Sequence, residues 1–195
     1  MRIEVVPYHA HRDYVRHARA EILGVSAEHL TDRRITPVSF AKYLFAYSDS
    51  ESTPIGFAEA AMHHDIYDSY EATPYGPFCD LSDFCPIEQM AGIRTIFVEP
   101  ERRRGSPAFL ALCYYSAMYF SVMGATYTTA TTRADDAYVN ALYCKIGGGC
   151  LGTGEYDGIE SSLFVFNLHD LVANRFLARA ARAFVFEPDP AFALA

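Results

Sequence analysis

Three consecutive arginines and a glycine lie between a short apolar run and a long apolar segment, in "VEPERRRGSPAFLALCYYSAMYF" from Val98 to Phe120. A strand that turns directly into a helix leaves several backbone N–H groups unpaired at the helix start, and these donors bind anions together with the helix dipole. Guanidinium groups can hold phosphate oxygens in a bidentate way, and Gly105 would let the backbone approach a bulky anion. The segment therefore predicts a phosphate-binding turn, with a solvated arginine turn as the alternative.

The electrostatic context favours the first reading. The chain has a formal net charge of −8, and only Lys42 and Lys145 among its 16 basic residues are lysines. Positive charge at a helix N-terminus is otherwise unfavourable by about 0.3–1 kcal/mol per group. Ser106 can cap the following helix, and Pro107 occupies the first helical turn, where proline is favoured.

Two segments carry a family resemblance. "VEPERRRGSP" resembles the pantetheine- and pyrophosphate-binding loop of the GCN5-related N-acyltransferases (GNAT), V-x-P-x-x-[RQ]-x-x-G-x-[GA], whose fixed positions are met by Val98, Pro100, Arg102 and Gly105. Pro107 stands where the family has a second small residue. "NALYCKIGGG" resembles the family's "lYeklGF" segment through Leu142, Tyr143, Lys145 and Gly147. The two segments follow each other in the family's order, with a strand between them.

The resemblance implies that a primary amine attacks an acyl thioester. Backbone groups near Phe97 and Val98 would hold the pantetheine and polarise the carbonyl, and the donor's phosphate would lie on a set formed by Arg102, Arg103, Arg104, Gly105 and Ser106. Tyr143 would be the general acid that protonates the departing thiolate, although a helical tyrosine is otherwise a core residue.

The remaining roles have competing assignments. Glu88, just before the central strand, is the first candidate for the base, or else a surface carboxylate. Glu59 interrupts an apolar run and competes with it, and a chain of waters could also remove the proton. Arg94, in mid-strand, either holds the acceptor's carboxylate or pairs with an acidic neighbour, because an unpaired buried charge is costly.

Within this family, the sequence is most similar to the N-acyl amino acid synthases and acyl-homoserine lactone synthases. The resemblance implies transfer of a long-chain fatty acyl group from acyl carrier protein to the amine of an amino acid. An acetyl-CoA-dependent N-acetyltransferase of a small amine or protein is the alternative within the fold, and a non-catalytic acyl- or CoA-binding module is the alternative outside catalysis. The co-substrate would be an acyl-phosphopantetheine or acyl-CoA, with no tightly bound cofactor. His63, His64, Cys79 and Cys85 do not have the spacing of a usual zinc site, so we expect no metal.

Strands and helices alternate along the chain and predict one mixed α/β domain over 1–195, with a central mixed sheet flanked by helices. Strands are expected at 2–8, 40–49, 54–64, 92–98, 125–132 and 161–168. Helices are expected at 11–23, 26–30, 107–123, 135–146 and 168–184. Glycine and proline punctuate 65–87, which predicts a long irregular insertion.

Composition limits the remaining classes of function. The acidic balance argues against general nucleic-acid binding, and five cysteines without periodic spacing fit free thiols. No apolar run reaches the ~18–20 residues of a membrane span, and the start lacks a signal-peptide core, so we expect a cytoplasmic protein. Arginines repeat at i, i+4 and i+7 in two helices, from Arg12 to Arg19 and from Arg175 to Arg182. Such rows are either solvated faces or docking sites for acyl carrier protein.

Overall fold

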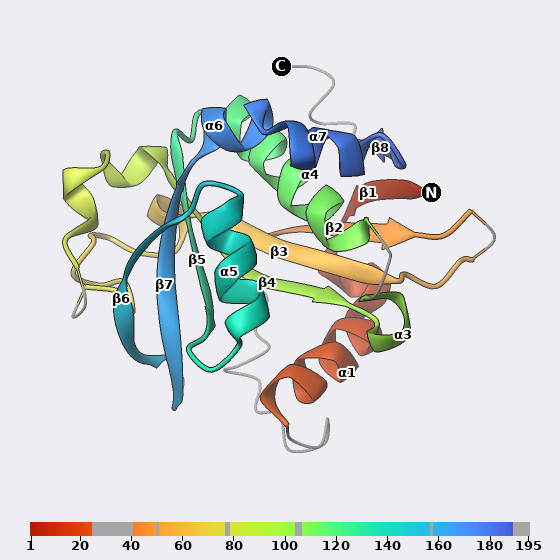
Figure 1. Ribbon diagram of the computed structural model, residues 1–195, viewed down its shortest axis with the longest axis horizontal. Coiled ribbons are helices and arrows are strands. Elements are labelled where there is room, and N and C mark those ends of the chain that lie inside the picture. Colours follow the sequence, from red (N-terminus) through yellow and green to blue (C-terminus); the bar gives the residue numbers. More distant parts are fainter. Residues whose placement is uncertain (25–40, 50, 77–78, 104–106, 157, 189–195) are drawn as a thin grey trace.

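A computed structural model describes residues 1–24, 41–49, 51–76, 79–103, 107–156 and 158–188. Within them, eight strands form one mixed sheet in the order β6-β7-β5-β4-β3-β2-β1-β8, flanked by helices (Figure 1), as predicted. The strands are β1 (Arg2–Val6), β2 (Lys42–Tyr47), β3 (Gly56–Met62), β4 (Met90–Val98), β5 (Tyr127–Arg133), β6 (Gly149–Tyr156), β7 (Ile159–Asn167) and β8 (Val185–Glu187). The α-helices are α1 (Arg12–Leu23), α3 (Pro100–Arg103), α4 (Ala108–Val122), α5 (Ala137–Lys145), α6 (Leu168–Ala173) and α7 (Arg175–Ala181).

The two faces of the sheet bury different clusters because side chains alternate along each strand. Aliphatic residues such as Leu44, Ala58 and Ile93 face α4, α6 and α7. The opposite face is aromatic beneath α1, where Tyr43, Phe45, Phe57, Phe97 and Tyr47 pack together. Part of the high aromatic content therefore fills the core beneath α1.

The segment between β3 and β4 has little regular secondary structure where the structure describes it. The described parts of 63–89 contain turns and three short 3-10 helices, at His63–Asp65, Leu81–Asp83 and Ile87–Gln89. Tyr75, Leu81 and Cys85 from this insertion pack on Met90 and Leu163 of the sheet. The insertion thus covers the end of the sheet that α1 leaves open (Figure 1).

The centre of the sheet opens between β4 and β5. These parallel strands pair only over Met90–Ile93 and Tyr127–Ala130. Beyond that point β4 continues to Val98 beside β3, and β5 continues to Arg133 beside β7, so the two strands diverge (Figure 1). The diverging part of β4 has no strand partner on that side within the described chain. Its backbone edge can therefore bind an extended ligand.

A β-bulge in β4 lies where the strands begin to diverge. Glu59 of β3 pairs with Thr95 and the next residue, Ala60, pairs with Ile93, so Arg94 is the extra residue. A bulge bends its strand and redirects a side chain. This bulge places Arg94 beside Glu59.

Two strands and one helix break differ from the sequence-based expectations. We did not predict β6, because its sequence "GCLGTGEY" contains three glycines, nor β8, a three-residue edge strand parallel to β1. The single helix predicted over 168–184 is wrong: Asn174 ends α6 and starts α7, its side-chain oxygen accepting from the N–H groups of Phe176 and Leu177.

The short helix α3 was not predicted either, since we expected the strand to turn directly into the next helix. The remaining elements agree with prediction to within two or three residues. Gly24 closes α1 in the left-handed conformation with φ 66°, and the β2–β3 hairpin forms as expected. Pro107 stands immediately before α4 rather than inside its first turn. The helix predicted at 26–30 and the capping role of Ser106 lie outside the described residues.

Candidate active site

An apolar hollow lies where β4 and β5 separate. Ile93 and Ala130 are the last residues that pair the two strands, and both line it. The remaining lining comes from β4, α4, α5, β7 and α6, namely Ile96, Cys113, Tyr143, Ile146, Phe166 and Leu171. Burial raises the pKa of the Cys113 thiol to about 12, so this thiol is neutral and poorly nucleophilic. The hollow therefore suits an apolar group and brings Tyr143 beside it.

Tyr143 is buried, and only 5% of its surface is exposed. Its ring stacks on Phe109 at 6.4 Å and meets Phe164 and Phe166 edge-on at 5.3 and 5.4 Å between centroids. Burial raises the pKa of its hydroxyl above the ordinary tyrosine value, so the proton stays on oxygen at neutral pH. The side chain is thus packed among aromatic rings and protonated, as a general acid must be before it reacts, although the raised pKa makes the hydroxyl a weaker acid than a free tyrosine.

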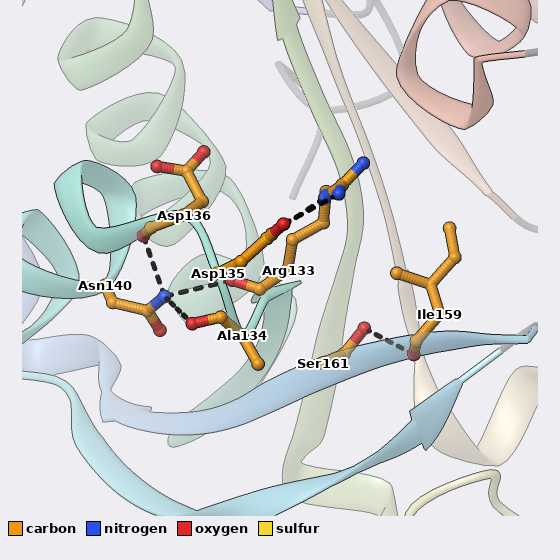
Figure 2. Close-up of polar contacts among 7 residues, drawn as sticks. All are labelled: Arg133, Ala134, Asp135, Asp136, Asn140, Ile159 and Ser161. Carbon is orange, nitrogen blue, oxygen red and sulfur yellow. Dashed lines mark hydrogen bonds and ion pairs between the residues drawn. The ribbon is translucent and has the colours of Figure 1, made fainter.

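The turn between β5 and α5, which Figure 2 shows, leads into the helix that carries Tyr143. Asp136 caps α5 by accepting from the N–H of Val139 at 3.0 Å. The Asn140 amide donates to the carbonyls of Arg133, Ala134 and Asp136 at 3.0, 3.4 and 2.7 Å. Because Asn140 lies one turn before Tyr143, this network fixes the helix that carries the tyrosine.

The arginine turn is tied to neighbouring elements. Arg102 forms an ion pair with Glu51 at 2.7 Å. Arg103 pairs with Glu21 of α1 at 2.9 Å and donates from Nε to the carbonyl of Val98 at 2.8 Å. Its guanidinium also lies 5.4 Å from the centre of the Phe97 ring. Both described arginines thus brace the end of β4, while each side chain stays about half exposed.

Of the other donor-binding candidates, the structure describes only Phe97 and Val98. Phe97 and Val98 lie at the end of β4, in the strand segment that diverges from β5, and both are buried. Arg104, Gly105 and Ser106 lie outside the described residues. The phosphate-binding role of this turn remains a prediction from the sequence.

Glu59 lies at the centre of a buried charge cluster. Its side chain is fully buried and forms ion pairs with Arg19 of α1 and with Arg94, the latter at 3.2 Å. Two guanidinium groups compensate one carboxylate, so the cluster is stabilised only while Glu59 is ionised. This arrangement disfavours Glu59 as a proton acceptor, and it makes Arg94 both a structural partner and a cation beside the sheet opening.

Glu88 is exposed and belongs to the short 3-10 helix Ile87–Gln89 that precedes β4. It therefore lies beyond the paired stretch Met90–Ile93, at the end of β4 opposite Val98. That stretch spans about 10 Å at a strand rise of ~3.3 Å per residue. The geometry does not bring Glu88 to the hollow.

His63 is a buried group that sequence reasoning did not assign. It is 2% exposed, its Nε2 lies 3.1 Å from the hydroxyl of Thr129, and its ring stacks on Tyr75 at 6.0 Å. Gly92 permits this packing, since a Cβ there would lie 2.9 Å from Nε2. Burial lowers the pKa of His63 to about 4. No local sequence pattern would have revealed this contact, because His63, Gly92 and Thr129 lie far apart in the chain.

His63 should make stability depend on pH. Its folded pKa of about 4 lies below the ordinary value of 6.5, so the unfolded chain binds a proton first as pH falls. The stability that comes from keeping His63 neutral is fully present above pH 6.5 and is lost as pH falls toward 4. The expected loss is about 3 kcal/mol in the free energy of unfolding. Urea unfolding at several pH values measures it.

The matched comparison uses two glutamine variants. His63→Gln should flatten the profile between pH 6.5 and 4, whereas His64→Gln, at the exposed neighbour that faces Asp65 at 3.5 Å, should keep the wild-type slope. Parallel profiles for wild type and His63→Gln would contradict the assignment.

Among the described residues, no three His, Cys, Asp or Glu side chains gather as metal ligands would. No helix in the described part of the chain is both long and apolar enough to cross a bilayer.

Comparisons with known proteins bear on the fold. No protein-family model matches the sequence, and no curated protein matches it. Solved structures do match. The CoA-dependent acyl-homoserine lactone synthase BjaI, with SAM and isopentyl-CoA, superposes with a TM-score of 0.66 at 15% identity, over 96% of this chain and 93% of BjaI.

Two acetyltransferase structures agree. NAA60 from Arabidopsis thaliana, in complex with acetyl-CoA, gives a TM-score of 0.65 at 15% identity, over 86% of this chain and 98% of NAA60. A protein assigned to the GNAT acetyltransferases from Desulfovibrio desulfuricans gives 0.53 at 17%, over 86% and 97% of the two chains. At these identities the likeness concerns the fold, and by superposition this chain has the fold of the GNAT acyltransferases.

Proposed function

We propose that this protein is an N-acyltransferase that moves a long-chain acyl group from a phosphopantetheine thioester to the amine of an amino acid. The neutral amine attacks the thioester carbonyl, the C–N bond forms and the C–S bond breaks. Tyr143 gives its proton to the departing thiolate, the proton lost by the amine passes to solvent, and solvent returns a proton to Tyr143. The amide and the free thiol of the carrier are the products.

The observation that carries the proposal is the apolar hollow beside the diverging edge of β4. An extended pantetheine arm can pair with the free backbone edge of β4, as an added strand does. The hollow has no polar lining and a volume of about 10 Å³, so the acyl group would enter it beside the ring of Tyr143 only after the surrounding side chains move apart. BjaI and NAA60, which share the fold, were solved with isopentyl-CoA and acetyl-CoA, and this supports a thioester donor.

The acceptor site would lie on the aromatic face, at Arg94. This guanidinium is 24% exposed in its side chain and shares Glu59 with Arg19. A bidentate contact with a carboxylate would orient an amino acid so that its amine reaches the opening between β4 and β5. An amine without a carboxylate would lack this contact.

A second candidate function is acetyl transfer from acetyl-CoA. The narrowness of the hollow favours it, because Tyr143, Phe166 and Leu171 close around the space where a chain would extend. A long chain would then require these side chains to move. A non-catalytic module is the third candidate, which no observation in the described structure favours over the first two.

One experiment separates the three. The protein is incubated with a long-chain acyl carrier protein, the matching acyl-CoA or acetyl-CoA, and a panel of amino acids and their decarboxylated amines, and products are read by mass spectrometry. We expect N-acyl amino acids from the long-chain donors. Products from acetyl-CoA alone would replace the proposal by the second candidate, and no product from any donor would leave a binding module.

Arg94→Lys tests the acceptor site within the same assay. The variant keeps a positive charge beside Glu59 but loses the planar fork, so kcat/KM for amino acids should fall about 10–100-fold, equivalent to ~1.5–3 kcal/mol for charged hydrogen bonds. The matched control is the decarboxylated amine, whose poorer turnover should be equal in wild type and variant. A proportional loss for both acceptors would remove Arg94 from carboxylate binding.

A further inference from the structure

The arginine row on α1 is not a uniform surface. Arg12 is exposed, whereas Arg19 turns inward and its side chain is only 13% exposed. The row on the C-terminal side differs, since Arg175, Arg179 and Arg182 all stay exposed. Taking a guanidinium group out of water is costly unless it is paired. Arg19 is therefore a buried feature of the site rather than part of a solvated face.

The packing of α1 fixes the position of Arg19. Val15 and Ala18 are almost fully buried and belong to the aromatic cluster beneath the helix. Arg19 follows Val15 by four residues, so its side chain leaves the same face of α1. There its Nη2 donates a hydrogen bond to Oε2 of Glu59. The docked helix thus holds one oxygen of this buried carboxylate.

The contact between Arg94 and Glu59 is of a different kind. Nη1 of Arg94 lies 3.2 Å from Oε1 of Glu59, yet both atoms are buried and neither has a hydrogen-bond partner. Every other arginine ion pair among the described residues includes a hydrogen bond. Glu59 therefore attracts Arg94 by charge without taking up its hydrogen bonds.

A buried phenol faces the same cluster. Tyr43 stands directly opposite Glu59 in the register of β2 against β3, so the two side chains share one face of the sheet. Tyr43 is 1% exposed, and its hydroxyl has no hydrogen-bond partner. Burial raises the pKa of Tyr43, and the nearby charges of Arg19 and Arg94 partly offset this. Since buried polar groups are nearly always hydrogen-bonded, the unsatisfied donors of Arg94 and Tyr43 mark an anion-binding place rather than a closed ion pair.

Arg19 determines whether Arg94 keeps its donors. A carboxylate and a guanidinium group form their strongest pair through two parallel hydrogen bonds. Because Arg19 holds one oxygen of Glu59, only the other oxygen faces Arg94 and this two-point pair does not form. Without Arg19, Glu59 would rotate and form the two-point pair. Arg94 would then have its fork occupied and its charge neutralised, and would bind a second carboxylate poorly.

We propose that Arg19 is a positioning residue that keeps Arg94 available for the carboxylate of the acceptor amino acid. It acts by holding Glu59 on the α1 side of the cluster, and it does not itself touch the acceptor. This inference rests on the proposed N-acyltransferase function and deepens its acceptor site. An arginine that only anchored α1 would contribute stability without affecting which acceptors are used.

Arg19→Met tests the inference by separating KM from kcat. Methionine keeps an apolar stem in the packed interface but releases Glu59 to pair with Arg94. The KM for amino acids should rise about 10-fold or more, with kcat within about 2-fold of the wild-type value. The kcat/KM for the decarboxylated amine should change less than about 2-fold, because this acceptor has no carboxylate to bind. The matched control is Arg12→Met, at an exposed position of the same helix, which should leave both acceptors unaffected.

A double variant provides a rescue that a structural role would not show. Arg19→Met with Glu59→Gln removes both the positioning residue and the competing carboxylate, and leaves Arg94 as a free cation. The KM for amino acids should return to within about 3-fold of the wild-type value, although both ion pairs are lost. Arg19→Lys, which keeps a cation on Glu59, should lie between wild type and Arg19→Met. If Arg19→Met fails to fold, the comparison of Arg19→Lys with the double variant still decides, and urea unfolding checks that each variant is folded.

Isothermal titration calorimetry gives a measurement that does not need turnover. The common protein amino acids and their decarboxylated amines are titrated into wild type, Arg19→Met and the double variant. Amino acids should bind wild type and the double variant more tightly than Arg19→Met, and the amines should bind all three alike. Equal weakening for both kinds of acceptor in Arg19→Met, or a double variant as impaired as Arg19→Met, would overturn the inference.

The proposed function can fail separately. If no donor yields product but amino acids bind in the expected order, the role of Arg19 stands and the acyltransferase proposal fails. If products form only from amines without a carboxylate, acyl transfer stands and the inference about Arg19 is wrong. A wild-type protein that neither binds nor acylates any amino acid would overturn both.

Discussion

Replacing Tyr143 by phenylalanine is expected to lower kcat by about 10²–10⁴-fold, with the KM for the acyl donor nearly unchanged. The hydroxyl would act only when the thiolate departs, so its removal costs transition-state stabilisation and no ground-state binding. Phenylalanine keeps the ring contacts with Phe109, Phe164 and Phe166, so the hollow keeps its shape. Steady-state kinetics with the best acyl donor measures the change.

Tyr115→Phe is the matched control for this substitution. Tyr115 is also buried in the same core, but its hydroxyl donates to the carbonyls of Ala181 and Phe184 at 3.1 Å, away from the hollow lining. Loss of the Tyr115 hydroxyl should lower the free energy of unfolding by about 1 kcal/mol and leave kcat within about 2-fold of the wild-type value. If Tyr143→Phe retained wild-type turnover, or if both variants lost activity alike, Tyr143 would not be the acid.

Glu59→Gln is expected to lower the free energy of unfolding by about 3 kcal/mol. The substitution removes the one carboxylate between Arg19 and Arg94 and leaves two guanidinium groups facing each other in the interior. Glutamine has the same shape, so packing changes little and the loss reports the charge. Urea unfolding at pH 7 measures it.

The control for this prediction is an exposed ion pair of the same type. Glu51 pairs with Arg102 at 2.7 Å with its side chain 38% exposed, and Glu51→Gln should cost less than about 1 kcal/mol because solvent screens such pairs. Equal losses for the two variants would mean that the cluster is no more than a surface pair. A loss of turnover in folded Glu59→Gln much larger than its stability change would instead restore Glu59 as a base.

Local patterns in the chain predicted most of the fold. Two β-like runs separated by a polar turn identified β2 and β3, and nearly continuous apolar residues identified β4. Gly24 closes α1 and Asp136 caps α5, and both are local helix-end residues. Each of these signals acts between residues that are neighbours in sequence, so they could be read without knowing the tertiary structure. The strands β6 and β8 were not predicted, because the glycines of β6 and the short length of β8 remove that local signal.

The candidate site also combines features set by local sequence with features set by tertiary contacts. The sequence alone determined which residues could do chemistry: the arginine turn and the motif that contains Tyr143, both short and contiguous. Only the tertiary structure decided how distant charges pair. Arg19 lies 40 positions from Glu59, and the bulge that turns Arg94 toward that carboxylate depends on the register of β3 against β4. Tertiary structure likewise separated Glu88 from the hollow and exposed the row at Arg175. The reason is physical: burial and charge pairing arise from contacts between elements, and these are set by sheet order and register rather than by any one segment.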